Sequence, residues 1–327
     1  MRVRKPIALF VFLTLALGIL AICSLSIGSV SVANPWQVIF NPTLTGAEQQ
    51  IIWQIRFPRI LAALLVGAAL GVAGALAQAA TNNPLADPSI IGTSAGAALG
   101  ASIVIVLNIA SVGSLVATGA AVVGALLASL ATISLSRSAL QLVIIGIATS
   151  ALLNALVGLV ISIADVPEAR SISFWSYGSL ALADTQSVQI TAPLLSITIF
   201  LGWYYAKNLD LLVLGERAVS HLGKDSKKLR LGAFLLISIL IATSVSTVGA
   251  ISFLALAAPH IARALLGPKN RPLLIGSALV GAGLLLIADT AARSIAPPNE
   301  LPIGLISALI GAPILIFVLR KGSEVWR

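Results

Sequence analysis

Cysteine and charged side chains are scarce in this sequence, and each scarcity excludes a class of protein. Cys23 is the one cysteine among 327 residues, which excludes an intramolecular disulfide and a cysteine-based metal site. Charged residues make up 9% of the chain, whereas ordinary soluble domains carry about 25%. Together with a hydrophobic content of 58%, this composition excludes a soluble globular protein and indicates a polytopic membrane protein.

Sequence motifs of enzymes are also missing. The chain has no GxxxxGK[ST] phosphate loop, no HExxH, no GxSxG and no paired carboxylates at helical spacing inside an apolar run. We therefore expect no catalytic residue, no metal ligands and no ATPase activity in this chain. The net charge of +9 does not indicate nucleic-acid binding, because the basic residues flank apolar runs and form no basic stripe.

Long apolar runs dominate what is present. Inside a bilayer every backbone polar group needs an internal partner, so a spanning chain forms helices or a closed barrel. The runs are near-continuous, which favours an all-α protein over a barrel. We expect ten transmembrane helices, over about residues 6–27, 57–80, 90–108, 113–135, 140–164, 188–206, 231–248, 249–266, 273–291 and 303–319. Polar connections are expected over 31–54 and 165–187. A cleaved signal peptide is the alternative for the first run.

The distribution of basic residues predicts the orientation of the chain. Ten spans place both termini on one side, and cytoplasmic termini leave four basic residues outside, namely Arg56, Arg59, Arg170 and Arg293. The other sixteen of the twenty then lie inside. The opposite orientation reverses that count, so the positive-inside rule favours cytoplasmic termini.

Residues 207–230 form the one long polar segment between apolar runs. Nine of the thirty-one charged side chains lie within it. At helical spacing one apolar face collects Leu211, Leu214, Ala218 and Leu222. Gly215 can separate two short turns, and Gly223 is typical of a helix stop. The pattern predicts a short amphipathic helix at the cytoplasmic membrane surface, with a solvated loop as the alternative.

Three smaller features admit both a structural and a functional interpretation. The segment 83–85 (Asn-Pro-Leu) is either a gate or a plain turn, because Pro ends a helix and leaves its last carbonyls to neighbouring groups. Arg56 and Arg59 either face a partner or snorkel towards lipid headgroups. Asp289, the only acid in an expected span, shares a helix face with Arg293, which favours a structural ion pair.

Small residues and a histidine complete the features that we single out. Gly67, Gly71 and Gly74 in the second run permit close helix packing. His260 lies near the end of the eighth run, where an interfacial role is favoured over a metal or haem ligand.

Two long patterns, joined by a shorter one, run through the chain in a fixed order. The first comprises 55–61 (IRFPRIL), 65–70 (LVGAAL), Gly74, Gln78, 83–88 (NPLADP), Gly92 and 96–97 (GA). The second comprises 249–253 (GAISF), 258–263 (APHIAR), Gly267, 288–289, 292–293, 300–304 (ELPIG) and 310–313 (IGAP). Between them lie Trp175, 178–179 (GS), 215–218 (GERA) and 222–223 (LG). Together these residues resemble the FecCD-type permeases, the membrane subunits of iron-siderophore, haem and cobalamin ABC importers.

The resemblance implies a single transmembrane permease domain over 1–327 with the type II ABC importer architecture, in the bacterial cytoplasmic (inner) membrane. Implied partners are a second permease subunit, identical or paralogous, two ATPase subunits, a periplasmic or lipid-anchored binding protein, and membrane lipid. No cofactor is implied in this chain, because ATP and Mg would bind the ATPase. A ferric chelate, an iron-siderophore above all, is the favoured cargo, with haem or cobalamin as alternatives.

The resemblance also implies roles for particular residues. The segment at about 207–230 would couple to the ATPase through Leu214, Gly215, Glu216, Arg217, Ala218, Leu222 and Gly223. Arg56, Arg59 and Arg293 would form an exposed basic rim that receives acidic residues of the binding protein. The cytoplasmic gate would comprise Asn83, Pro84, Leu85 and Ser138. The fifth and tenth helices would form most of the pathway wall.

Two positions depart from the family pattern. Asn82 stands where the family usually has Arg, and Ala255 stands where a Gly normally allows tight packing.

Two alternatives come from other classes of protein, namely an ion-coupled secondary transporter and a non-transporting membrane scaffold. An ion-coupled carrier is expected to place acids near the bilayer midplane, which this sequence does not do.

Overall fold

The structure is a computed structural model that describes residues 6–28, 32, 35–40, 46–111, 114–136, 138–181 and 183–321. Within these residues every regular element is a helix and none is a strand, which confirms the expected all-α fold. The basic residues at the two ends of the chain, 1–5 and 322–327, lie outside the described part.

The helices follow one another with short connections. In chain order they are α1 (Pro6–Ser26), α2 (Pro35–Phe40), α3 (Ala47–Gln50), the π-helix η1 (Ile51–Arg56), α4 (Phe57–Thr81), the 3₁₀ turn η2 (Pro88–Ile91), α5 (Thr93–Val106), α6 (Leu115–Leu135), α7 (Ala139–Ser162), α8 (Val166–Ser176), α9 (Thr185–Leu209), the 3₁₀ turn η3 (Asp210–Leu214), α10 (Glu216–His221), α11 (Ser226–Val248), α12 (Leu254–Leu266), α13 (Asn270–Ala292) and α14 (Ile303–Lys321).

Among the described residues, seven helical stretches are long and apolar enough to cross a membrane. They contain α1, α4, α6, α7, α9, α11 and α13. Three shorter apolar helices, in α5, α12 and α14, fall at the third, eighth and tenth expected spans. The seven long and three short helices therefore coincide one for one with the ten predicted runs.

Both predicted polar connections contain short helices, which were not predicted from the sequence. In the first, α3 runs directly through η1 into α4, because Glu48 and its neighbours are good helix formers. Ile52 then packs with Val32 and Val38 in a small apolar cluster. In the second, Pro167 occupies the first turn of α8, a position that a helix tolerates.

Polar side chains fix where several spanning helices begin. Asp225 accepts hydrogen bonds from the first backbone N–H groups of α11, and Ser138 accepts one from Gln141 at the start of α7. Asp184 and Ser187 form a reciprocal capping box on α9. Hydrogen bonds from Ser187 also lower the pKa of the Asp184 carboxyl, so it stays an ionised acceptor at neutral pH.

Glycines on α4 allow the helices at the centre of the bundle to touch backbone to backbone. A Cβ at Gly67 would meet the Gly281 backbone, and one at Gly71 would meet Ser277, both on α13. The predicted close packing is thereby confirmed. Gly74 lies against the Ala255 carbonyl of α12. Gly74 thus allows α4 to approach the backbone of α12 at Ala255.

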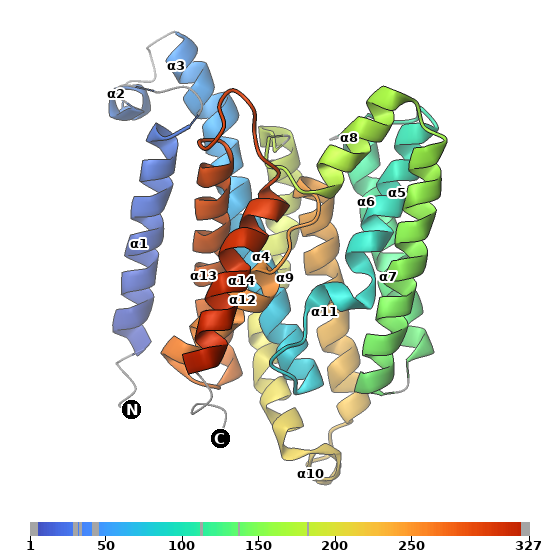
Figure 1. Cartoon of the computed structure of the whole chain (residues 1–327). Coiled ribbons are helices and arrows are strands. Elements are labelled where there is room, and N and C mark those ends of the chain that lie inside the picture. Colours follow the sequence, from blue (N-terminus) through green and yellow to red (C-terminus); the bar gives the residue numbers. More distant parts are fainter. Residues whose placement is uncertain are drawn as a thin grey trace.

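The helices form one bundle with two distinct ends (Figure 1). One end carries α10, together with the start of α1 and the end of α14, and we name it the α10 end. The opposite end carries α3 and α8, and we name it the α8 end. The beginning of α4 points towards the α8 end and its last turn towards the α10 end (Figure 1).

Candidate functional site

Buried charges join α4, α13 and the loop before α14 near the α8 end. Arg59 donates from Nε to Asp289 Oδ1 at 2.8 Å and from Nη1 to Glu300 Oε1 at 2.8 Å. Arg293 Nε lies 3.6 Å from Asp289 Oδ2, which confirms the structural ion pair expected from their spacing. The Asp289 side chain is 0% exposed and both arginine side chains are 5% exposed. Because a lone buried charge is costly, these groups depend on one another.

Backbone carbonyls of α1 complete this cluster. Arg56 donates from Nη1 to the Leu25 and Ser26 carbonyls. Arg293 donates from Nη2 to the Ser24 carbonyl. The last carbonyls of a helix have no partner within it, so the two arginines satisfy those of α1 and hold α1 against the bundle.

The expectation of an exposed basic rim was wrong. Arg56, Arg59 and Arg293 are each 4% exposed, because acids and carbonyls distant in the sequence enclose them. The member of the cluster that reaches the surface is Glu300, whose side chain is 29% exposed. Burial lowers the pKa of Arg293 to about 10, so its guanidinium stays charged at neutral pH. A docking role for the three arginines stays a prediction.

A cavity of about 500 Å³ lies between η2, α5, α7 and α8. Its polar lining is uncharged and consists of Ser89, Ser94, Ser150, Asn154, Ser173, Ser176 and Tyr177. Hydroxyl and amide groups of this kind donate and accept hydrogen bonds. α7 is the fifth predicted span, so the cavity lies where the resemblance implies one pathway wall. Within the described lining α14, the tenth span, contributes no residue.

The predicted gate residues 83–85 follow Asn82, the residue that ends α4, and we call residues 83–85 the gate turn. Asn82 has a left-handed conformation with φ of 50°, which ends the helix where Asn is tolerated better than most residues. The Asn83 side chain then accepts a hydrogen bond from the Leu85 N–H at 2.9 Å. Leu85 is 53% exposed. The turn is confirmed as a structure, and its gating role stays a prediction.

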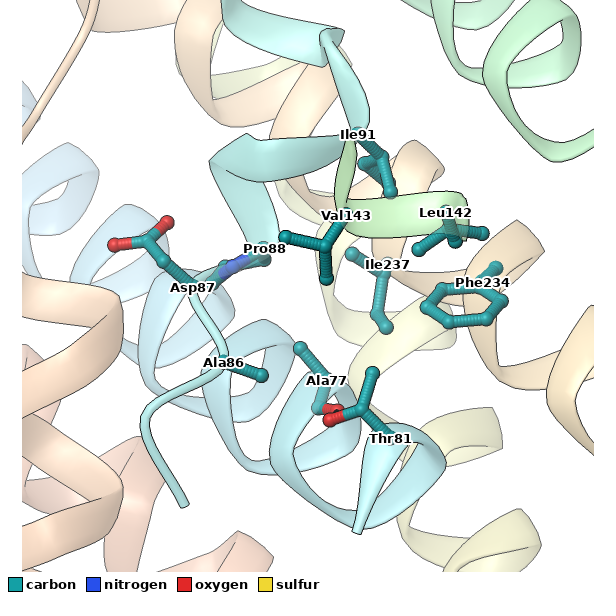
Figure 2. A pocket seen from close by; sticks show the side chains of 10 residues that line it. All are labelled: Ala77, Thr81, Ala86, Asp87, Pro88, Ile91, Leu142, Val143, Phe234 and Ile237. Atoms are coloured by element: carbon teal, nitrogen blue, oxygen red, sulfur yellow. The ribbon is translucent and has the colours of Figure 1, made fainter. Parts of the chain in front are cut away.

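The segment after the gate turn packs against the start of α7. Figure 2 shows Ala86, Asp87 and Pro88 on one side of a small pocket and Leu142 and Val143 on the other. The volume open to water in this pocket is only about 10 Å³. Ser138 lies at the first turn of this same α7 and is exposed. The two predicted parts of the gate therefore meet through apolar side chains of their neighbours.

The predicted coupling residues form two short turns and not one amphipathic helix. Gly215, with φ of 86°, separates η3 from α10, and Gly223 has φ of 71°. The break shifts the helical phase, so the buried residues are Leu212 and Val219, at 2% and 0% exposure. We call residues 210–223 the coupling segment.

The predicted apolar face of the coupling segment does not pack against the bundle. Leu214 and Leu222 are 59% and 58% exposed, while Leu211 and Ala218 are half-buried. Glu216 and Arg217 are exposed. The exposed leucines are available to a partner, and the coupling role itself stays a prediction.

Sequence reasoning missed Arg230, at the start of α11. Its Nη1 donates to Glu216 Oε1 at 2.7 Å, and its Nε donates to the Ala80 carbonyl at 3.2 Å. The one signal in the sequence was Pro84, which has no N–H for the Ala80 carbonyl four residues earlier.

A second polar group between α4 and α12 was also missed. Arg263 donates from Nη2 to Gln78 Oε1 at 2.8 Å, and Gln78 Nε2 lies 3.3 Å from His260 Nδ1. His260 is 2% exposed and lies inside the bundle, and its position at the membrane interface stays a prediction. These three residues belong to the sequence patterns, but only the folded chain brings them together.

Comparisons with known proteins cover almost the whole chain. The model of the FecCD transport family matches residues 13–321. The hemin transport system permease protein HmuU of Yersinia pestis is 38% identical, over 88% of this chain and 87% of its own length. The Fe(3+) dicitrate transport system permease protein FecD of Escherichia coli strain K12 is 37% identical, over 86% and 89%. The vitamin B12 import system permease protein BtuC of Vibrio cholerae is 37% identical, over 74% of each chain.

A solved structure has the same architecture. It is described as a metal-chelate type ABC transporter in an inward-facing conformation, and it matches with a TM-score of 0.88 at 33% identity. The match covers 96% of this chain and 99% of that one. With the family model matching nearly all of the sequence, this chain belongs to the FecCD transport family.

Proposed function

We propose that this chain is the permease subunit of an ABC importer that carries a ferric chelate across the bacterial cytoplasmic membrane. The observation that carries the proposal is the family match over residues 13–321, supported by a bundle with seven long and three short apolar helices in its described part. The chain itself supplies the pathway, and ATP hydrolysis belongs to a separate ATPase subunit that binds ATP and Mg.

The cargo follows from the relatives. Those named above act on hemin, ferric dicitrate and vitamin B12, all of them metal complexes. Ferric dicitrate is itself a ferric chelate, and a ferric chelate, in particular an iron-siderophore, is the cargo we favour. Haem and cobalamin are the alternatives. The serine and asparagine side chains of the 500 Å³ cavity suit weak hydrogen bonding to the polar exterior of such a complex as it passes.

The two ends of the bundle take different partners in this proposal. The α10 end faces the cytoplasm, where two ATPase subunits dock on the exposed leucines of the coupling segment. The α8 end faces outwards and receives a periplasmic or lipid-anchored binding protein. A second permease subunit closes the pathway along α7.

Uptake by the reconstituted importer tests the function. Proteoliposomes with the permease, its ATPase and its binding protein are given a radiolabelled ferric siderophore, hemin or cobalamin. We expect ATP-dependent uptake of a ferric chelate, and none with an ATPase whose nucleotide site is disabled. Uptake that needs an ion gradient and no ATPase would establish the ion-coupled carrier instead.

Thiol labelling tests the orientation. In a Cys23→Ser background, single cysteines replace Arg170 on α8 and Lys224 beyond α10, both of which are exposed. We expect an impermeant thiol reagent added to sealed cells to label position 170 and not position 224. Labelling of position 224 from outside would contradict cytoplasmic termini.

A further inference from the structure

We infer that Asn82 and Arg230 connect the coupling segment to the gate turn through two hydrogen-bonded bridges. The inference rests on the proposed function, because it concerns how ATP-driven movement reaches the gate. Both bridges join groups that are far apart in the sequence, and both lie at the α10 end of the bundle.

The first bridge runs through Arg230. In a continuous helix the Ala80 carbonyl accepts from the N–H four residues later, but that residue is Pro84, which has none. Arg230 Nε donates to the Ala80 carbonyl instead, at 3.2 Å, while its Nη1 donates to Glu216 Oε1 at 2.7 Å. One rigid guanidinium therefore holds the end of α4 and the start of α10 at the same time. A lysine offers a point charge and no planar fork.

The second bridge runs through Asn82. Its Nδ2 donates to the Leu212 carbonyl in η3 at 2.9 Å. Asn82 is also the residue whose left-handed backbone ends α4. A displacement of η3 therefore pulls on the residue that directly precedes the gate turn.

Arg230 also borders the cavity that Ser138, the second part of the predicted gate, lines. It lines a cavity of about 360 Å³ together with Ser138, Leu142 and Phe234. Ser138 begins α7, and Leu142 packs beside the segment that follows the gate turn (Figure 2). A movement of α10 that displaces Arg230 therefore acts on the end of α4 directly and changes the shape of the cavity beside Ser138.

Removal of both bridges tests the inference in the complete importer. Asn82→Gly keeps the left-handed backbone and deletes the amide, and Arg230→Met keeps an apolar stem of similar length without donors. The matched control is Lys228→Met, an exposed basic residue two positions before Arg230 in α11. Arg230→Lys serves as the conservative variant. Spin labels at positions 85 and 140, which are 53% and 70% exposed, report the gate distance with and without a non-hydrolysable ATP analogue.

The double variant should uncouple hydrolysis from transport. We expect binding-protein-stimulated ATP hydrolysis to stay within about twofold of wild type, uptake to fall at least tenfold, and the gate distance to stop responding to nucleotide. Arg230→Lys should restore part of the uptake, and Lys228→Met should resemble wild type. Equal membrane abundance of all variants excludes a folding defect.

Two results would overturn the inference. One is uptake and nucleotide response in the double variant equal to wild type. The other is hydrolysis and uptake that fall together while the gate distance still responds, because the residues then act in ATPase docking. Failure of the wild-type importer to show any ATP-dependent uptake would overturn the proposed function itself.

Discussion

Charged side chains at the two ends of the bundle are held in opposite ways. At the α8 end, Asp289 is fully buried and pairs with two arginines that are 5% exposed. At the α10 end, Glu216 and Arg230 pair at 2.7 Å with side chains 66% and 22% exposed. The nitrogen–oxygen distances of the Arg59–Asp289 and Arg230–Glu216 pairs are similar, but the first pair is buried and the second is partly exposed to solvent.

This difference separates a fixed part of the molecule from a part that can move. Removal of one partner from a buried pair leaves a charge without water, whereas an exposed pair exchanges readily with solvent. The buried cluster also holds the α1 carbonyls through Arg56 and Arg293. The α8 end is therefore built to stay assembled, and the α10 end is built to rearrange at low cost.

Asp289→Asn should have the largest effect. It leaves Arg59 and Arg293 buried with only Glu300 nearby, so we expect a loss of about 3–5 kcal/mol in the free energy of unfolding. Thermal unfolding in detergent and abundance in the membrane measure it. The control is Glu48→Gln in α3, an exposed acid near the same end. Equal stability of the two variants would contradict the comparison.

Gly223→Val and Ala218→Trp should affect function and not folding. Gly223 has φ of 71°, which strains a β-branched residue by about 1–3 kcal/mol. Trp in place of the half-buried Ala218 should overpack the contact with the ATPase and weaken it by about 1–3 kcal/mol. We expect uptake and stimulated ATP hydrolysis to fall together by about tenfold or more, at unchanged membrane abundance.

The control for these two variants is Ser220→Ala, at an exposed position of the same α10. It should retain wild-type uptake and hydrolysis. Wild-type activity of Gly223→Val and Ala218→Trp would rule out a coupling role and leave the segment a solvated connection.

Local signals predicted the local structure at both ends. Pro84 and the polar residues before it predicted the end of α4, and the spacing of Asp289 and Arg293 predicted their pairing, because both depend on neighbours within one helix. Hydropathy located all ten apolar helices, since the length and composition of a run are enough to place it.

Contacts between residues that are distant in the sequence could not be predicted from local patterns. Arg59 and Glu300 are 241 positions apart, and nothing in either local pattern shows that they meet. The exposure expected of the three arginines was therefore wrong, and their docking role stays a prediction. Leu212 and Val219 were missed for another reason, because Gly215 changes the helical phase between them and a single stripe no longer applies.

Glu300→Gln should show whether Arg59 has a docking role besides its structural one. Its charged bond to Arg59 Nη1 becomes a neutral one, so we expect a stability loss of about 1 kcal/mol. If Arg59 also receives a carboxylate of the binding protein, the less neutralised arginine should speed association a few-fold at low salt, and high salt should remove the gain. Docking rates by surface plasmon resonance measure this. Unchanged rates at both salt concentrations would leave Arg59 a structural residue alone.

Glu216→Gln should have the smallest effect on stability. Like Asp289, Glu216 accepts a hydrogen bond from an arginine at less than 3 Å. It is exposed, however, so its pair contributes only about 0–1 kcal/mol. We expect a change in unfolding free energy below about 1 kcal/mol, which shrinks further in 1 M salt because exposed charges are screened. The Asp289→Asn loss should largely persist in that salt, because the side chains of both arginines are only 5% exposed and buried charges are screened much less. Parallel unfolding of both variants at low and high salt makes the measurement, and similar losses would mean that burial does not distinguish the two ends.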